Sequence, residues 1–148
     1  MSGGAVSFEV VGVPVQQGSK RHVGNGVMIE AANGHRAWRH AVATEARQVA
    51  DGRTDTPLDG PLCLSVRFRF PMPASRPKRT QRIGIGWKLS APDLDKLVRS
   101  IGDALTESGL IRDDARIGMV LASKVETTDW SGAEIKLHRL DDVDLANL

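Results

Sequence analysis

PDLDKLVRSIGDALTESGLIRDD, residues 92–114, is the stretch that decides the fold, because it contains the most regular helix of the chain. Pro92 favours an extended residue before it, and Gly109 is typical of the position just after a helix C-terminus. The apolar residues between them follow the spacing of one helix face: Leu94, Leu97, Val98, Ile101 and Leu105. The stretch therefore predicts an amphipathic helix over residues 93–108 that buries this face in the core.

Strands and one further helix surround this stretch. Residues 61–70, PLCLSVRFRF, alternate apolar and polar side chains, which predicts a strand with Arg67 and Arg69 on the face away from the core. The other expected elements are strands at residues 6–13, 27–30, 116–126 and 133–140 and a helix over residues 34–51. We expect the last two strands to form a hairpin, because only a short turn near residues 129–132 separates them.

The main elements follow the order β-α-β-α-β-β. This order predicts an α/β fold, with a mixed β-sheet and two main helices packed on it in a single domain. We expect this domain to span residues 1–140 and to be followed by a short acidic C-terminal tail, residues 141–148.

Composition excludes several classes of protein. The 148 residues are 41% hydrophobic and 26% charged, which suits one globular domain with a core. The one cysteine, Cys63, has no partners at zinc-ligand spacing, so we expect a small buried residue. Neither an apolar run of about 20 residues nor a signal-peptide pattern occurs, so we expect no membrane span and a cytoplasmic protein.

Basic residues gather between Arg67 and Lys88, where no aspartate or glutamate occurs. The prolines and glycines of residues 71–86 predict that much of this region is a long basic loop. A basic block opposed to an acidic tail indicates a polyanionic partner. A solvated loop that helps solubility explains the same block, so the charge pattern alone does not decide.

Asp93 and Asp95 form a D-x-D motif at the predicted helix start. Residues two apart within a helix point to opposite sides, but a carboxylate in the cap position and one in the first turn can converge. Ionised carboxylate oxygens are what Mg²⁺ binds, together with waters and phosphate oxygens. The motif predicts a magnesium site. The alternative is that Asp93 is only an N-cap and Asp95 only first-turn charge.

Asp113 and Asp114 stand together before an apolar strand, where packing gains nothing from paired acids. The helix from Asp95 to residue 108 travels roughly 20 Å, and residues 109–114 can recover at most about the same length. Asp114 can therefore just return to the D-x-D motif if the chain doubles straight back. Otherwise it meets the motif across a dimer interface.

Arg99 lies four residues after Asp95 and four before Asp103. One hypothesis is a row of ion pairs, each worth about 0.2–0.5 kcal/mol, and we assign Asp103 to that role. Arg99 also suits a second role, because its planar fork of donors can hold a scissile phosphate or stabilise the charge of a transition state.

These residues together resemble the signature of the RusA family of Holliday junction resolvases, which are crossover junction endodeoxyribonucleases. The pattern is P-D-L-D-x-L-x-(K/R), then D-A-L, then a glycine and a D-D pair before a strand. The resemblance covers most of residues 6–140 and is specific over residues 92–118. The residues in register are Pro92, Asp93, Leu94, Asp95, Leu97, Arg99, Asp103, Ala104, Leu105, Gly109, Asp113 and Asp114.

The resemblance implies an α/β homodimer that binds branched DNA, above all a four-way junction, and cuts paired strands with Mg²⁺, or with Mn²⁺ in its place. Carried over by position, Asp93, Asp95 and Asp114 are the catalytic acids that bind the metal. Arg99 stands where the family typically has a catalytic lysine, and it can contact phosphate there but cannot transfer a proton. Asp113 is then either a supporting neighbour of these ligands or a solvated residue. Phage or prophage origin in a bacterial host is in keeping with the resemblance.

The function predicted is a Mg²⁺-dependent, structure-selective endonuclease of DNA recombination and repair, without a nucleotide cofactor. The side chains expected to hold DNA phosphates are Lys20, Arg21, Arg76, Lys78, Arg79 and Arg82. One alternative is a catalytically weak or inactive branched-DNA-binding protein, and another is a flap or fork nuclease of the same chemistry. An enzyme that binds a nucleotide sugar through the D-x-D motif is disfavoured by the short chain and leaves the basic block unexplained.

Overall fold

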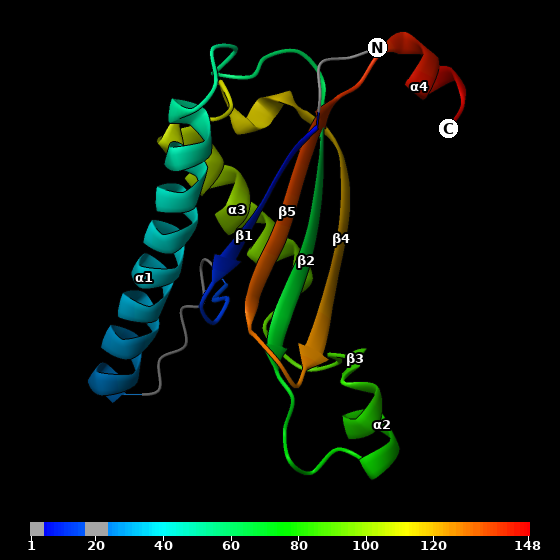
Figure 1. The fold of residues 1–148 in the computed structure, drawn as a ribbon. Coiled ribbons are helices and arrows are strands. Elements are labelled where there is room, and N and C mark those ends of the chain that lie inside the picture. The colour runs from blue at the N-terminus through cyan, green and yellow to red at the C-terminus, as the bar shows by residue number, and fades with distance from the viewer. Residues whose placement is uncertain (1–4, 17–23) are drawn as a thin grey trace.

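The computed structural model describes residues 5–16 and 24–148, which form one α/β domain (Figure 1). The strands are β1 (Val6–Val11), β2 (Leu62–Pro71), β3 (Ile85–Trp87), β4 (Ile117–Thr127) and β5 (Gly132–Arg139). The helices are α1 (Gly24–Asp51), α2 (Lys78–Ile83), α3 (Leu94–Ser108) and α4 (Asp142–Ala146), with a 3₁₀ turn η1 at Asp114–Arg116. The acidic tail predicted over residues 141–148 contains α4.

β2 is the central strand of the five-stranded sheet, whose order is β1-β5-β2-β4-β3. It pairs in parallel with β4 and antiparallel with β5, so the sheet is mixed as predicted. The alternation predicted for this strand is confirmed, because one set of its side chains is almost fully buried: Leu62, Leu64, Val66, Phe68 and Phe70.

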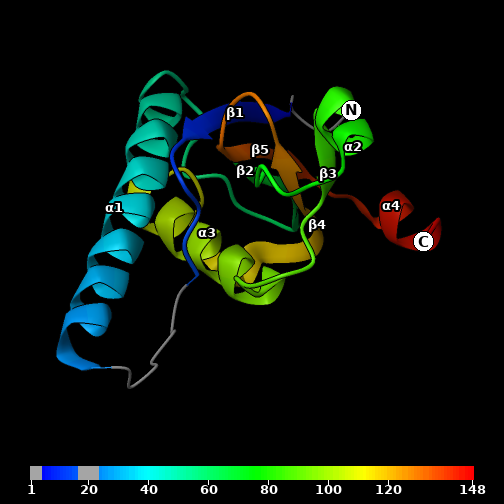
Figure 2. The ribbon, with the colours of Figure 1, turned by 90° about the horizontal axis from the view of Figure 1, so that it is seen from below.

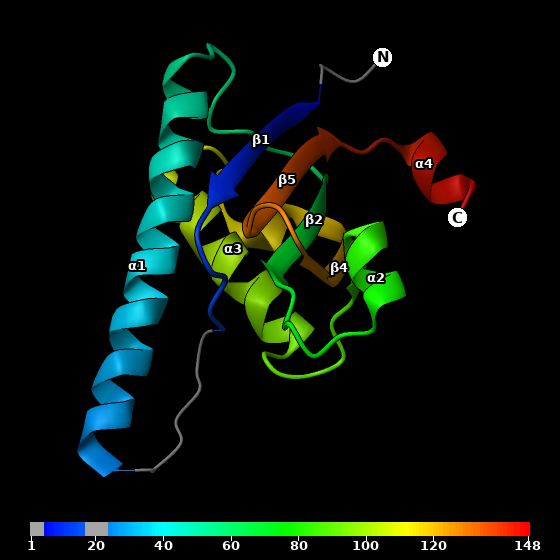
Figure 3. The ribbon, with the colours of Figure 1, turned by 60° about the horizontal axis from the view of Figure 1, so that its bottom comes forward.

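The two long helices, α1 and α3, both lie on the face of the sheet that these β2 side chains form (Figures 2 and 3). The helix predicted over residues 93–108 is confirmed as α3, with Leu97, Ile101 and Leu105 fully buried. It ends at Gly109, whose φ of 81° is the left-handed conformation that glycine adopts most readily. Two main helices on a mixed sheet are therefore the observed fold, as predicted.

The hairpin expected between β4 and β5 is wrong. β2 lies between these strands, and both pair with it rather than with each other. The short connection over residues 128–131 therefore crosses the end of β2. A strand whose inner side chains are all apolar, such as β2, buries most apolar surface in the centre of the sheet. A short turn between two strands does not show whether a third strand lies between them.

Helix α1 begins at Gly24, ten residues before the predicted start, so the strand predicted at residues 27–30 is wrong. The prediction took Gly34 as the start of the helix. A glycine inside a helix costs only about 1 kcal/mol relative to alanine, which packing readily offsets. Here a β-carbon on Gly34 would make an ordinary contact with the Val15 side chain at 3.7 Å, so packing does not require a glycine at this position.

Residues 71–86 contain α2 and β3, so the prediction of one long loop is wrong. Pro77 precedes the first turn of α2, and Gly84, with a φ of 84°, ends it. β4 anchors this region, since Arg76 donates to both carboxylate oxygens of Glu126 at 2.6 and 2.9 Å. Glu126 is only 2% exposed, which makes this pair an internal support of the segment rather than a surface contact.

No helix in the part of the chain that the structure describes is long and apolar enough to cross a membrane.

Replacing Glu126 by glutamine tests the support of the segment. The hydrogen bonds from Arg76 lower the pKa of Glu126, so the pair stabilises the fold above the ordinary glutamate pKa and loses this effect as the pH falls through the lowered value. We expect the melting temperature of Glu126→Gln to be about 3–8 °C below wild type at pH 7, with the difference shrinking in acid.

The matched control is Glu107→Gln, which removes the exposed pair between Glu107 and Arg39. Calorimetry should find a much smaller change for this control. Equal melting temperatures for wild type and Glu126→Gln at pH 7 would contradict the role given to the buried pair.

Candidate active site

The N-terminus of α3 carries the first two candidate acids. Asp93 is the N-cap residue and Asp95 lies in the first turn, as the sequence predicts. The Asp93 carboxylate makes no hydrogen bond to the helix amides, is 61% exposed, and lies 3.6 Å from the Lys96 ammonium. Its backbone amide donates instead to the Gln16 side chain at 2.7 Å. Asp93 is thus in the cap position without acting as a side-chain cap, which leaves its carboxylate available for other ligands.

Asp114 lies beside the middle of α3, against Gly102. A β-carbon on Gly102 would stand 3.4 Å from the β-carbon of Asp114, an ordinary contact, so η1 lies against a helix position with room for alanine but not for a large side chain. Gly102 is seven residues after Asp95, which is about 10 Å along the helix and nearly the same direction around it. The chain after α3 therefore doubles back part of the way, and Asp114 reaches the same side of the helix as Asp95.

Arg99 lies between these positions on the same side of α3, one turn after Asp95, and its side chain is exposed. The i,i+4 ion pairs considered for it, with Asp95 and with Asp103, are not formed: among the described residues no carboxylate lies within salt-bridge distance of the Arg99 guanidinium. Asp95, Arg99 and Asp114 thus follow one another along the outer side of α3. The Arg99 guanidinium pairs with neither Asp95 nor Asp103.

The neighbouring carboxyl of Asp113 raises the pKa of Asp114, and desolvation and the negative charges of Asp113 and Asp103 act in the same direction. The amide of Ala115 donates to Asp113 at 3.0 Å and holds the pKa of that carboxyl below its ordinary value. A cation placed beside this pair would favour the ionised form of Asp114.

The three predicted metal ligands are not gathered in one cluster. Within residues 5–16 and 34–148 no three histidine, cysteine, aspartate or glutamate side chains lie close enough together to hold a metal ion. The acids stand instead as two pairs in the sequence, Asp93 with Asp95 and Asp113 with Asp114. Mg²⁺ usually takes one or two carboxylates and completes its coordination with waters and substrate phosphates. By donor chemistry each pair therefore fits such an ion, with DNA phosphate supplying further ligands.

The basic residues predicted to bind DNA fall into three groups. Lys20 and Arg21 lie outside the described residues. Arg76 is described, but its guanidinium is engaged by buried Glu126. The remaining three side chains are exposed on the short helix α2 and form no ion pair with any described residue: Lys78, Arg79 and Arg82.

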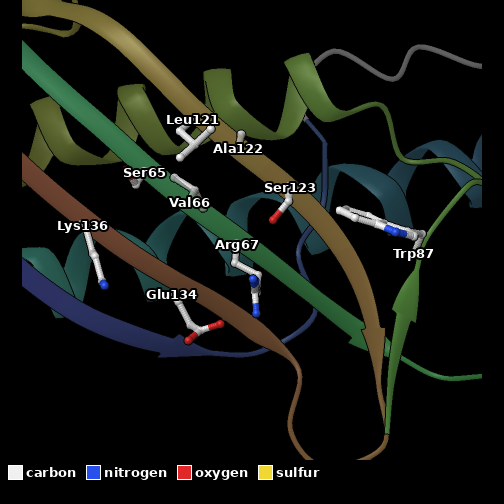
Figure 4. Close-up of a pocket in the computed structure, with 9 residues that line it drawn as sticks. All are labelled: Ser65, Val66, Arg67, Trp87, Leu121, Ala122, Ser123, Glu134 and Lys136. Carbon is white, nitrogen blue, oxygen red and sulfur yellow. The ribbon is translucent and has the colours of Figure 1, made fainter. Parts of the chain in front are cut away.

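The opposite face of the sheet, which carries neither long helix, contains a shallow pocket of about 510 Å³ (Figure 4). Trp87 and Leu121, which are 69% and 70% exposed, stand over it, and Arg67, Glu134 and Lys136 contribute the charged side chains. None of the predicted site residues lines this pocket. The candidate active site is therefore the outer side of α3 and not this hollow of the sheet.

Sequence reasoning missed several residues that shape this site. Gly102 carried a usable signal, because a glycine inside a helix often marks a close approach of another segment. His35, whose Nε2 lies 3.3 Å from the Ser100 hydroxyl of α3, and Gln16, which binds the amide of Asp93, carried none. Their contacts join residues more than sixty positions apart, and no local pattern encodes them.

The close approach at Gly102 predicts different results for two substitutions. In Gly102→Ala the added β-carbon makes ordinary contact with Asp114, and the gain in helix propensity should raise the free energy of unfolding by up to about 1 kcal/mol. In Gly102→Leu the side chain overlaps Asp114 and Ile117, so we expect a loss of about 1–3 kcal/mol and a displaced η1. Urea unfolding and the amide resonance of Asp114 measure the two effects. A leucine variant as stable as the alanine variant, with Asp114 unmoved, would refute the contact.

The comparison with known protein families bears on this arrangement of acids and arginine. The family model described as endodeoxyribonuclease RusA matches residues 10–138, which is most of the 148-residue chain and includes every element from β2 to β4. No curated protein matches the chain. The match includes α3, η1 and the two acid pairs, and it extends well beyond the motif at residues 92–118. The chain belongs to the RusA endodeoxyribonuclease family.

Proposed function

We propose that this protein resolves four-way DNA junctions by paired, Mg²⁺-dependent hydrolysis of phosphodiester bonds in recombination and repair. Membership of the RusA family implies Holliday junction resolvase activity. The observation that carries the proposal further is the outer side of α3, where Asp95, Arg99 and Asp114 lie along one line. Carboxylates that suit a hard cation, next to a guanidinium that suits phosphate, are the groups that such hydrolysis requires.

The acids would hold the metal. Asp93 and Asp95 are the ligands at the helix start, with Asp114 at the second position and Asp113 beside it. Mg²⁺, or Mn²⁺ in its place, would supply an activated water and neutralise charge on the phosphate oxygens. The protein's own part is to keep these four carboxylates exposed, open to solvent and to a DNA strand.

Arg99 binds the phosphate in this proposal. Its guanidinium stays protonated at any working pH, so it cannot transfer a proton to or from a reacting oxygen. It can donate two hydrogen bonds to the phosphate and oppose the negative charge that grows in the transition state. The absence of an ion pair to Asp95 or Asp103 keeps these donors available.

DNA contacts outside the site would come from α2, which presents Lys78, Arg79 and Arg82 to solvent. We also assign Lys20 and Arg21 to phosphate contacts. Backbone contacts of this kind give affinity that depends on salt and little on base sequence. We propose that the protein acts as a homodimer, because a two-fold pair of sites matches the two opposed strands that are cut in a four-way junction.

The first test is cleavage of a synthetic four-way junction by wild type and by Asp95→Asn. We expect wild type to make paired nicks with Mg²⁺ and none with EDTA, and Asp95→Asn to lose at least about a hundredfold in rate, since a metal ligand is removed. Asp142→Asn, in the C-terminal helix α4, is the matched control and should cut like wild type.

Linear duplex, flap and fork substrates complete the experiment. Preferred cutting of a flap or fork would assign the same chemistry to another branched substrate. Tight junction binding without nicks under any metal would overturn the enzymatic proposal and leave a branched-DNA-binding protein.

The contribution of α2 predicts a change in salt dependence. Replacing Lys78, Arg79 and Arg82 by glutamine should weaken junction binding and reduce the slope of log K against log salt by up to about 3, since each phosphate that is no longer neutralised lowers the slope by about 0.9. Filter binding of the junction in EDTA, from low to physiological salt, measures this slope. The control variant removes the same amount of positive charge from other parts of the chain, at Arg47, Arg53 and Arg112. Equal slopes for the two variants would exclude a specific role for α2.

A further inference from the structure

The segment between β3 and α3 positions the first pair of acids and has no regular secondary structure of its own. Only residues 88–93 separate the end of β3 from the first residue of α3. Asp93 follows Pro92 directly, and the Asp93 carbonyl accepts the first hydrogen bond of the helix, from Leu97 at 3.1 Å. The position of the Pro92 carbonyl, whose peptide group joins Pro92 to Asp93, therefore determines the positions of Asp93 and Asp95.

Lys124 of β4 holds this segment. Its ammonium donates to the carbonyl of Ser90 and to the carbonyl of Pro92, both at 2.7 Å. Its own carbonyl accepts from the amide of Lys88 at 3.2 Å, which ties the beginning of the segment to the same residue. Hydrogen bonds from a charged donor are short and roughly twice as strong as neutral ones. One side chain thus fixes both carbonyls that flank Ala91.

This use of a lysine is unusual in two respects. The ammonium binds main-chain carbonyls, and no carboxylate among the described residues lies within salt-bridge distance of it. Its side chain also projects to the core-facing side of the sheet, since Lys124 stands opposite buried Phe68 in the parallel register. Gln16 also holds the segment, because its side chain accepts from the amide of Asp93 at 2.7 Å.

We infer that Lys124, together with Gln16, is a positioning residue of the nuclease site, which sets the place of Asp93 and Asp95 through the main chain of residues 90–93. The inference rests on the proposed function, because it concerns the geometry of the acids that would hold the metal. Lys124 touches neither DNA nor metal in this role. Its removal should impair metal binding and turnover while leaving junction affinity intact.

The test uses the full chain as wild type, Lys124→Met, Gln16→Leu and the control Lys136→Met. Lys136 is an exposed lysine on the opposite face of the sheet, and its replacement changes the net charge equally. The measurements are Mn²⁺ affinity of the DNA-free protein by calorimetric titration, single-turnover cleavage of a saturating junction complex, and junction affinity in EDTA. Circular dichroism establishes that each variant is folded.

We expect Lys124→Met to lose about 10–100-fold in Mn²⁺ affinity and in single-turnover rate, as is usual when a residue that orients metal ligands is removed. Its junction affinity in EDTA should stay within about twofold of wild type, and Gln16→Leu should show a smaller loss of the same kind. Lys136→Met should match wild type in Mn²⁺ affinity and in rate.

Wild-type Mn²⁺ affinity and rate in folded Lys124→Met would overturn the inference, and so would a loss confined to junction affinity, which would make Lys124 a DNA contact. If Lys124→Met does not fold, Gln16→Leu decides, and wild-type values there would overturn the inference. Wild type that binds Mn²⁺ without cutting any branched substrate would sink the proposed function alone, since the Mn²⁺ titrations still test the positioning role. Wild type that neither binds Mn²⁺ nor cuts would sink both.

Discussion

The burial of one face of α3 against the sheet is the constraint on which the rest of the structure depends. Leu97, Ile101 and Leu105 are fully buried on this face, and successive residues of a helix turn by about 100°. Once these leucines and isoleucine are in the core, Asp95 and Arg99 must face outward. The same helix therefore supplies a large part of the core and sets the direction of the candidate site. A change that rotates α3 would disturb both together.

β4 connects this core to the segment that precedes α3. Lys124 and Glu126 are two residues apart, so their side chains lie on the same side of the strand. Glu126 binds Arg76 near the beginning of the segment over residues 72–92, and Lys124 binds carbonyls near its end. The ladder to β2 places both residues opposite phenylalanines of the core. Two charged side chains on one strand thus determine how a Pro-rich and Gly-rich segment leaves the sheet and where it returns.

Local patterns in the sequence predicted the elements that bury one face and expose the other. The helix over residues 93–108 and the strand at residues 61–70 carried clear periods of 3.6 and 2, and both are observed as α3 and β2. Asp93 in the cap position, Asp95 in the first turn and Gly109 at the end of the helix also follow from residue preferences, and the structure has all three.

Features that depend on distant partners were not predicted. The sequence predicted strands at residues 116–126 and 133–140, but not that β2 separates them, because strand order is decided by the whole sheet. Arg76 was taken for a DNA contact because it lies in a basic block, whereas its partner Glu126 is fifty residues away. No role was predicted for Lys124, because the groups that accept its hydrogen bonds are main-chain carbonyls, which every residue has. α2 was missed for a different reason. The prolines and glycines around it indicated a loop, and a helix this short and polar has no apolar pattern that would reveal it.

The outer side of α3 gathers negative charge. The neighbouring carboxyl of Asp113, desolvation and the charges of Asp113 and Asp103 raise the pKa of Asp114. Arg99 stands between the two acid pairs without pairing with Asp95 or Asp103, so it reduces the repulsion only at a distance. A DNA strand brings further negative charge, and the acids alone would repel it. In the proposed function a cation bound by the acids would remove that obstacle, and the phosphate would offer ligands that the separated carboxylates lack. Metal and DNA should then each strengthen the binding of the other.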